Sequence, residues 1–144
     1  MINFSVNQPE KDKKYFQRIG AYVIIINDNL LATVKTKTGY FLPGGGLEKN
    51  ESPENCLVRE CLEEIGIKIK VIKKISQGNY YFFSTTKQTD MENIGHFYEG
   101  KIESVINVQT EKDHELIWLE PKKAITWLYL KNQQEAVRLF LNNN

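Results

Sequence analysis

Apolar residues occur in short runs separated by turn residues, which predicts a series of strands and helices around a buried core. The segment Arg18–Asn27 is rich in β-branched side chains and ends in Asn-Asp-Asn, so a buried strand and a turn are expected there. Leu30–Thr36 is the expected hairpin partner. Further strands are predicted at Tyr40–Leu42, Ile67–Ser76, Asn79–Thr86, Asn93–Ser104 and Glu115–Leu119, with a loop at Lys87–Asn93.

Three segments have the residues that begin and end helices. Ser52 is a good N-cap before Pro53, and Gly66 is a good C-terminal stop, so the first helix is expected between them. The other two helices are predicted at Pro121–Leu128 and Asn132–Asn143. This order of strands and helices indicates an α/β (α+β) sandwich, and the length of 144 residues favours one domain spanning residues 1–144.

Composition narrows the class of protein further. Net charge is only +1, so nothing global indicates a nucleic acid or an anionic membrane as partner. The strongest apolar run, Ala21–Ile26, is too short to cross a bilayer, and the N-terminus lacks an apolar signal core, so a cytoplasmic location is expected. Cys56 and Cys61 point about 140° apart on a helix and cannot form a disulfide with each other, which fits a reducing compartment.

Negative charge is concentrated around the first predicted helix. Residues 48–64 contain six acids and two bases, a net charge of 2 − 6 = −4, although the whole chain is at +1. A helical wheel places Leu57, Val58, Cys61, Leu62 and Ile65 on the buried side. On the same wheel Glu60, Glu63 and Glu64 lie mainly on the other side, with Cys56 beside them, where a raised thiol pKa and no functional role are expected.

The clustered carboxylates have two possible interpretations, a solvated acidic face or a metal site. A solvated acidic helix face is common, but Glu60 and Glu64 are like charges one turn apart, which destabilises a helix by about 0.2–0.5 kcal/mol. No lysine lies at helical spacing to relieve the repulsion, whereas Mg²⁺ or Mn²⁺ would, since both prefer carboxylate oxygens. The preceding triple glycine, Gly44–Gly46, is either a tight turn or a loop where the backbone can approach a ligand closely.

Spacing joins the glycines to the carboxylates. Residues 45–67 follow the pattern G-x5-E-x7-R-E-U-x-E-E-x-G-U, where U is a bulky apolar residue and Cys61 fills the first U. This segment resembles the Nudix box of the Nudix hydrolase family, whose members include MutT-like proteins. The flanking order of strands, with Tyr40–Gly46 before the box and Glu115–Leu119 late in the chain, extends the likeness over most of the sequence. The resemblance implies a Nudix-type α/β/α sandwich with a mixed β-sheet.

The resemblance also implies an activity and a metal. Nudix hydrolases cleave a diphosphate bond in a nucleoside diphosphate linked to another group, X, and use Mg²⁺ or Mn²⁺, which neutralises charge and activates water. Carried over residue by residue, the metal ligands are the carbonyl of Gly44 and the side chains of Glu60, Glu63 and Glu64. Arg59 and Glu51 match a pair that steadies these carboxylates. The general base is expected among Glu63, Glu111 and Glu115, although Glu115 fits a solvent-facing strand position equally well.

Substrate contacts are expected outside the box. Lys35 and Lys37 precede the glycines and could reach a phosphate, although exposed lysines are more often plain surface. In the strand at Asn79–Thr86 alternate aromatic residues share a face, so one pair is expected in the core while the other lines a pocket. We assign Tyr81 and Phe83 to the pocket.

Two other activities fit the same box. Removal of diphosphate from the 5′ end of RNA would need a basic groove, and the lysines of this chain are scattered. A regulator that binds a nucleotide without cleaving it is the other alternative. Such Nudix-like proteins usually lose box carboxylates, and this chain keeps all of them. The resemblance further suggests a homodimer and leaves X open.

Overall fold

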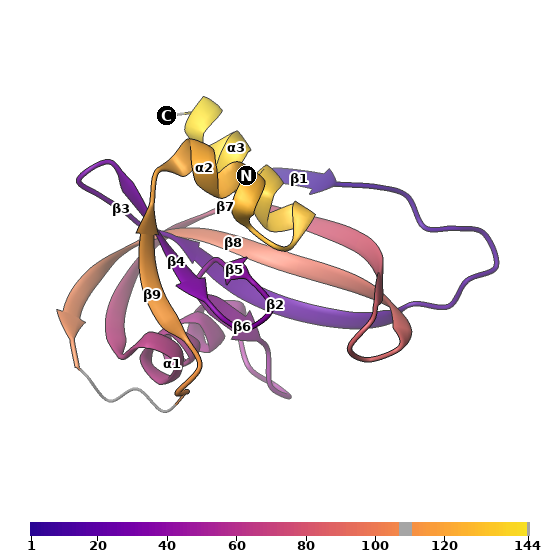
Figure 1. Ribbon diagram of the computed structural model, residues 1–144, viewed down its shortest axis with the longest axis horizontal. Coiled ribbons are helices and arrows are strands. Elements are labelled where there is room, and N and C mark those ends of the chain that lie inside the picture. Colours follow the sequence, from indigo (N-terminus) through magenta and orange to yellow (C-terminus); the bar gives the residue numbers. More distant parts are fainter. Residues whose placement is uncertain (107–110, 144) are drawn as a thin grey trace.

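The computed structural model describes residues 1–106 and 111–143, which form two sheets and three helices (Figure 1). The helices are α1 (Pro53–Ile65), α2 (Pro121–Trp127) and α3 (Lys131–Asn142). The strands are β1 (Ile2–Ser5), β2 (Phe16–Ile24), β3 (Ile26–Asn27), β4 (Leu30–Lys35), β5 (Tyr40–Phe41), β6 (Gly44–Gly46), β7 (Ile67–Ser84), β8 (Thr89–Val105) and β9 (Glu115–Leu119).

The larger sheet is mixed, as predicted. Its strand order is β1-β7-β8-β2-β6. The β1–β7 and β2–β8 pairs are parallel, whereas β7–β8 and β2–β6 are antiparallel. The smaller sheet has the order β3-β4-β5, with β9 added along β4. The two sheets together confirm the α/β class that the order of elements predicted.

The second half of β2, residues 20–24, is buried on both faces and therefore divides the core in two. Alternate side chains of a strand point to opposite faces. Val23 accordingly packs with Leu57 of α1, whereas Ile24 packs with Val137 of α3. In Figure 1 α1 lies on one side of the sheet, with α2 and α3 on the other. This arrangement confirms the predicted sandwich of a sheet between helices.

The β7–β8 hairpin differs from its prediction. Two separate strands were expected at Ile67–Ser76 and Asn79–Thr86, but one strand runs through both, because Gly78 does not interrupt it. The ring of Phe4 from β1 lies where a side chain at position 78 would be, with the position of a Cβ only 2.1 Å from that ring. The predicted loop at Lys87–Asn93 is also wrong from Thr89 onward, because residues 89–93 pair with β7 in the hairpin.

The triple glycine forms a strand and not a loop. Residues Gly44–Gly46 make β6, which pairs with Gly20–Tyr22 of β2. Gly44 has a φ of +141°, and a Cβ there would lie 2.0 Å from the carbonyl oxygen of Ala21. Glycine is required at this position because β6 presses directly against β2. This tight pairing leaves room for α1 to pack close to the β6 backbone.

Helix α1 begins and ends as predicted but buries a different face. Ser52 Oγ accepts from the amide of Asn55 at 3.1 Å, and Gly66 ends the helix with a φ of 64°. Val58 and Leu62, predicted as buried, are each 38% exposed, whereas Cys56 and Glu64 are buried. The buried stripe is turned by roughly a quarter of a rotation. The reason is that the helix packs against the glycines of β6, whose missing side chains admit this face.

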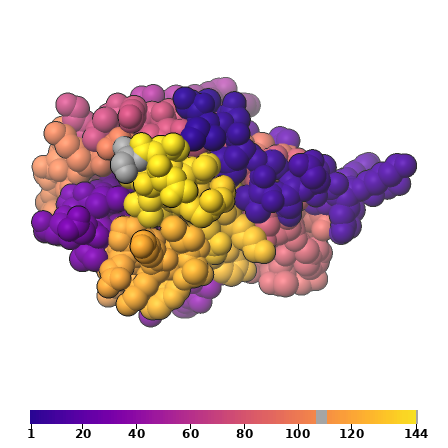
Figure 2. Space-filling view, turned by 90° about the horizontal axis from the view of Figure 1, so that it is seen from above, coloured from indigo at the N-terminus to yellow at the C-terminus, as the bar shows by residue number. Residues whose placement is uncertain are grey.

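Helix α3 is tied to the segment that leads into the glycines. It lies on the surface beside α2 and the N-terminal strand (Figure 2). The side chain of Gln133, at its N-terminal end, is fully buried, and its Oε1 accepts from the backbone amide of Leu42 at 2.7 Å. This bond holds the chain two residues before β6, so α3 helps to position the glycine strand.

The Gln133 bond gives a stability prediction. We expect Gln133→Ala to lower the free energy of unfolding by about 2–4 kcal/mol, because it leaves a cavity and a buried amide without an acceptor. Urea unfolding followed by circular dichroism measures this. The exposed neighbour Lys131 provides the control, since Lys131→Ala should change stability by no more than about 0.5 kcal/mol. Equal effects of the two substitutions would show that the bond does not hold the segment.

Candidate metal site and substrate cleft

Arg59 organises the carboxylates of α1 and the preceding loop. Its guanidinium binds Glu51 through two bonds, with Nε donating to Oε2 at 2.7 Å and Nη2 donating to Oε1 at 2.9 Å. Nη1 donates to Glu60 at 2.8 Å and to Glu63 at 3.1 Å. The guanidinium hydrogen bond holds the pKa of Glu51 at about 2. Arg59 therefore relieves the repulsion between these carboxylates, which have no lysine at helical spacing.

Glu64 is the buried carboxylate of the group. Only 6% of the residue is exposed, although the wheel placed it away from the core. The amide of Gly44 donates to its Oε1 at 3.2 Å, so β6 contacts α1 directly. Burial raises the pKa of Glu64 to about 8, and the nearby charges of Glu111 and Glu60 add to the rise, while the Gly44 amide opposes it. Burial likewise raises the pKa of Glu60, against the effect of Arg59.

Glu111 and His114, in the segment that precedes β9, complete the cluster. The Nδ1 atom of His114 lies 2.8 Å from Glu64 Oε2 and 2.9 Å from Glu111 Oε2, so one imidazole links both carboxylates. The amide of Glu111 also donates to the carbonyl of Glu63 at 3.4 Å, which docks this segment on α1. Sequence reasoning named Glu111 as a possible base but overlooked His114. The only signal was its position in the acidic segment before the Glu115–Leu119 strand.

The donor atoms suit a hard divalent cation. Two sets of side chains each place their ligand atoms within 4.8 Å of one another, and Glu111 belongs to both. One set adds Glu64 and His114, and the other adds Glu60 and Glu63. The carboxylate oxygens that make up most of both sets are the ligands that Mg²⁺ and Mn²⁺ prefer. The structure thus brings together Glu60, Glu63 and Glu64, as predicted from the box, with the backbone of Gly44 beside them.

Cys56 is buried in the core, which the wheel did not predict, although its Sγ stays next to the carboxylate network, 3.9 Å from Arg59 Nη2. Its Sγ donates to the carbonyl of Gly45 at 3.4 Å. Burial is the main cause that raises the pKa of its thiol to about 12, with a smaller contribution from the charge of Glu51. Both cysteines are free, as the sequence predicted. Cys56 therefore supports the contact of α1 with β6 and offers no thiolate at neutral pH.

Three residues that the sequence predicted for the site lie outside the carboxylate cluster or at its edge. They are Glu115, Lys35 and Lys37. Glu115, a candidate base, is the exposed first residue of β9, and belongs to neither ligand set. Lys35 lies opposite it on β4, with its ammonium 5.9 Å from the centre of the Tyr40 ring. Lys37 lines the cleft described next, and its ammonium lies 3.7 Å from Asp113.

A cleft of about 380 Å³ opens beside Glu64 and His114. Its floor carries Arg18 and Tyr22 of β2, and Asn93 of β8. A smaller hollow of about 150 Å³ shares Arg18 and Asn93 with the cleft and extends it away from the carboxylates. Aromatic rings line this far end, from Phe41, Phe82 and Tyr129. The combined cleft thus runs from an acidic end, past an arginine, to an aromatic end.

The aromatic residues assigned to the pocket lie elsewhere. Tyr81 and Phe83 line a different hollow near the N-terminal segment, where the Tyr81 ring packs 4.9 Å from that of Tyr15. The other pair, Tyr80 and Phe82, stacks with ring centres 5.0 Å apart, and Phe82 is the one that reaches the cleft. The alternation of side chains along the strand correctly predicted that Tyr80 and Phe82 share one face of the sheet, and that Tyr81 and Phe83 share the other. The side of the sheet that each faces is set by α3 and the loops, which a local pattern does not show.

Comparisons with known proteins agree with this geometry. The NUDIX domain model matches residues 16–140. Nudix hydrolase 21, chloroplastic, from Arabidopsis thaliana is 25% identical over 114 residues, which are 78% of this chain and 56% of that protein, so the chain spans little more than half its length. The structure of a NUDIX hydrolase from Nitrosomonas europaea matches with a TM-score of 0.73 at 16% identity, over 89% of this chain and 90% of that one.

A further structure extends the comparison. Dihydroneopterin triphosphate pyrophosphohydrolase from E. coli matches with a TM-score of 0.69 at 17% identity, over 91% of this chain and all of that one (100%). Among the described residues, no helix is both long and apolar enough to span a membrane. The family match takes in the glycine strand, the carboxylate helix and the cleft. The chain therefore belongs to the NUDIX domain family.

Proposed function

We propose that this protein hydrolyses a phosphoanhydride bond in a nucleoside diphosphate linked to a further group, X, with Mg²⁺ or Mn²⁺. The observation that carries the proposal is the continuity of the acidic cluster with a cleft that ends in aromatic rings. A nucleotide derivative has matching parts, with phosphates that bind cations and a base that stacks on rings. The names of two relatives, a hydrolase and a pyrophosphohydrolase, agree with this reaction class.

The metal would be held by the carboxylates of α1. Glu60, Glu63 and Glu64 supply the ligand oxygens, while Glu111, whose carboxylate belongs to both sets of neighbouring ligand atoms, is left to accept a proton. When bound, the cation neutralises phosphate charge and makes water more acidic. Glu51 and Arg59 hold Glu60 and Glu63 in place through the bonds described above.

Proton transfer is assigned to Glu111. It lies between the two ligand sets, and His114 contacts both its carboxylate and that of Glu64. A carboxylate so placed can accept a proton from an attacking water, while the imidazole keeps its orientation. Glu115 is the weaker candidate, because it is exposed at the start of β9, outside both sets.

Arg18 is the cation best placed to contact the substrate's phosphates from the protein side. It belongs to both parts of the cleft, between Glu64 at one end and Phe82 at the other. Its guanidinium nitrogens lie 3.1–3.2 Å from where a Cβ on Gly46 would be, so glycine there makes room for it. A planar guanidinium binds phosphate oxygens through two parallel bonds. The phosphates would thus lie between Arg18 and the carboxylates, with the base towards Phe41 and Phe82.

The buried carboxyl of Glu64 makes metal binding dependent on pH. Its pKa of about 8 means that the carboxyl holds a proton at neutral pH, and a cation must displace that proton. The affinity for Mn²⁺ should therefore rise roughly tenfold per pH unit up to about pH 8 and then level off. Titration of the metal-free protein followed by electron paramagnetic resonance measures this. A constant affinity between about pH 6 and pH 9 would contradict the role of Glu64 as a ligand.

The reaction and X can be identified in one experiment. A panel of nucleoside triphosphates, nucleotide sugars and dinucleotides is incubated with Mg²⁺ or Mn²⁺, and the phosphorus-containing products are separated. We expect cleavage within a diphosphate for at least one class of substrate. For that substrate Arg18→Met should raise KM at least about tenfold with a smaller change in kcat, because Arg18 binds phosphate in both ground and transition states. Cleavage of phosphate monoesters alone would contradict the proposal.

Two expectations, the oligomeric state and the location in the cell, stay predictions. A homodimer and a cytoplasmic location were inferred from the sequence and the family resemblance. Hydrolysis at the 5′ end of RNA stays the alternative, because the aromatic rings, Arg18 and Lys87 at the far end of the cleft are residue types that also contact single-stranded RNA. The same panel extended to a short 5′-triphosphate RNA distinguishes the two substrates.

A further inference from the structure

The floor of the cleft holds an amide to which the proposed reaction gives no role. Asn93 of β8 lies directly opposite Arg18 of β2 in the parallel pair, and both residues line the cleft and its aromatic extension. Asn93 is only 3% exposed. A buried amide is nearly always hydrogen-bonded, because an unpaired polar group in the interior is unfavourable. The oxygen and the nitrogen of this amide therefore each need a partner, in the protein or in a bound molecule.

The oxygen of Asn93 is bound by α3. The fully buried Asn132, near the start of that helix, donates through Nδ2 to Asn93 Oδ1 at 3.0 Å and to the backbone carbonyl of Gly78 at 3.2 Å. A backbone carbonyl can only accept, so the group of Asn132 that faces Gly78 is its NH₂ group. The atom of Asn93 that meets the same NH₂ group is then its oxygen. Asn93 therefore turns its own NH₂ group away from α3.

Glycines provide the space in which these side chains meet. Gly95 follows Asn93 by two residues on the same face of β8, and a Cβ there would lie 3.3 Å from Asn132 Nδ2. On the neighbouring strand, a Cβ on Gly20 would lie only 2.5 Å from the hydroxyl of Tyr22. The missing side chains thus admit the amide of α3 from one side and let the Tyr22 ring lie back along β2.

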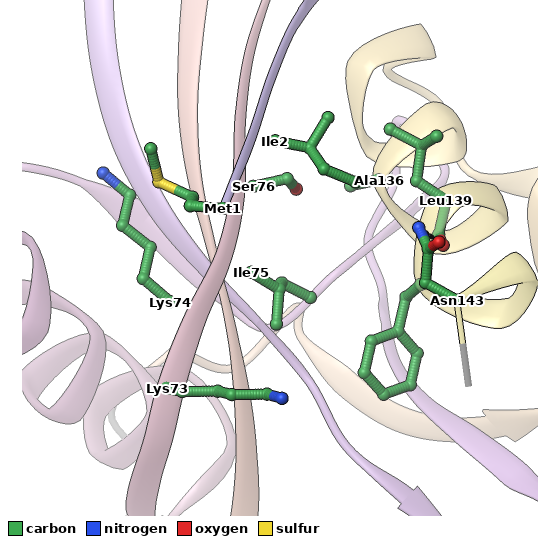
Figure 3. Close-up of a pocket in the computed structure, with 10 residues that line it drawn as sticks. Met1, Ile2, Lys73, Lys74, Ile75, Ser76, Ala136, Leu139 and Asn143 are labelled. Atoms are coloured by element: carbon green, nitrogen blue, oxygen red, sulfur yellow. Dashed lines mark hydrogen bonds between the residues drawn. The ribbon is translucent and has the colours of Figure 1, made fainter.

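The NH₂ group of Asn93 faces the cleft beside Tyr22. Burial raises the pKa of the Tyr22 hydroxyl, while the charge of Arg18 and a hydrogen bond from Asn93 oppose the rise. An amide nitrogen carries two hydrogens, so one is left for the cleft that both residues line. Neither residue contributes to the described polar atoms that are closed off from solvent without a partner. In the hollow between β7 and α3 (Figure 3), by contrast, the hydroxyl of Ser76 is closed off in this way.

From this arrangement we propose that Asn93 selects the base of the nucleotide by donating a hydrogen bond to a carbonyl oxygen of its ring. This selection rests on the proposed function, in which the phosphates lie at Arg18 and the base lies towards Phe41, a residue that lines both parts of the cleft. Because Asn132 holds the oxygen of Asn93, only a donor faces the cleft.

The donor distinguishes bases of the same shape. A 6-oxo purine or a 4-oxo pyrimidine presents an acceptor, whereas the corresponding 6-amino and 4-amino bases present a donor. A donor that faces a donor leaves both unpaired in a buried site, which weakens binding. The preferred substrates are therefore derivatives of nucleotides whose bases carry the oxo group.

The test uses nucleoside diphosphates, because every substrate of the proposed class contains one. The α,β-methylene diphosphates of inosine and adenosine form one pair, those of uridine and cytidine form the other, and all four resist cleavage. Their affinities for the full chain are measured by isothermal titration calorimetry with Mg²⁺. We expect the oxo member of the tighter-binding pair to bind at least about tenfold more tightly than its amino partner.

Variants of Asn93 separate base selection from a structural role. Asn93→Asp should reverse the preference, because one carboxylate oxygen still accepts from Asn132 and the other can accept only from the base. Asn93→Leu should abolish the preference, and decides the matter if the aspartate variant does not fold. Asn27→Asp adds the same charge at an exposed position of β3 outside the cleft, and should keep the wild-type preference.

The ratio of the two affinities is the deciding quantity, since a merely structural side chain would change both alike. An equal affinity for oxo and amino members, no binding of any of the four, or an unchanged ratio in the folded Asn93 variants would overturn the proposal. Cleavage of nucleotides without any oxo preference would leave the hydrolase assignment standing and remove the role of Asn93. An oxo preference in binding without anhydride cleavage in Mg²⁺ or Mn²⁺ would support the role of Asn93 and contradict the proposed function.

Discussion

Replacing Glu64 by glutamine is expected to lower kcat at least about 100-fold while the protein stays folded. Glutamine has the same shape, and its carbonyl oxygen can still accept from the amide of Gly44, so the contact between α1 and β6 remains. It has no charge for a cation and no second carboxylate oxygen facing His114. Steady-state kinetics with the substrate found from the panel measures the loss.

The same helix provides the control for Glu64. Glu54 is an exposed acid in the first turn of α1, so Glu54→Gln removes one charge without touching the cluster, and should retain near-normal kcat. Thermal unfolding of both variants shows whether the fold is kept. Because burial raises the pKa of Glu64, the glutamine variant should be at least as stable as the wild type above about pH 8, where the wild type must ionise a buried acid. A fully active Glu64→Gln protein would contradict the metal assignment.

Replacing Arg59 by methionine is expected to damage both stability and activity. The guanidinium is only 25% exposed and binds Glu51, Glu60 and Glu63 at once. Removing one partner of such a network leaves carboxylates close together without their counter-charge. We expect the free energy of unfolding to fall by about 2–4 kcal/mol, and kcat by at least tenfold, because the ligands lose their positions. Urea unfolding and kinetics on the same preparation measure the two effects.

A surface arginine tests whether charge removal alone explains the result. Arg138 forms an exposed ion pair with Glu135 on α3, far from the cluster in the fold. Arg138→Met should cost no more than about 1 kcal/mol and leave kcat unchanged. Excess Mg²⁺ should stabilise Arg59→Met more than the wild type, since the cation replaces part of the missing positive charge. If Arg59→Met and Arg138→Met behave alike, Arg59 does not organise the site.

The chemistry-bearing segment was predictable because its requirements are local. Ser52 and Gly66 fix the ends of α1 through single-residue capping rules, and these hold in the structure. Residues Glu60, Glu63 and Glu64 share one helix, so helical spacing alone brings their carboxylates together. The family resemblance depended on the same spacing, and the match over residues 16–140 confirms it.

The buried face of α1 was not predictable from the helix alone. A wheel based on hydrophobicity favoured Val58 and Leu62, which are exposed, over Glu64, which is buried. The deciding factor is the partner surface, since β6 consists of three glycines that let α1 approach. Read alone, the glycines indicated a turn or a loop. Their pairing with β2 is a contact between segments about twenty residues apart, which no local rule shows.

The residues that complete the site come from distant segments. His114 lies fifty residues after Glu64 in the sequence, and a lone histidine carries no pattern that assigns it a partner. Arg18 and Phe82 meet in the cleft only because β2 and β7 flank β8 in the sheet. The choice of Tyr81 and Phe83 for the pocket shows the same limit, since alternation separates two faces without indicating which one meets the cleft.

We propose that the carboxylates of α1 bind a divalent cation and that hydrolysis of a diphosphate depends on this cation. The most direct measurement is the rate of anhydride cleavage by metal-depleted protein before and after Mg²⁺ or Mn²⁺ is restored, at a pH above the pKa of Glu64. We expect negligible turnover in the presence of a chelator, full recovery when metal is restored, and no recovery for Glu64→Gln. Equal turnover with and without chelator would contradict this proposal, as would equal Mn²⁺ affinity for the wild type and Glu64→Gln.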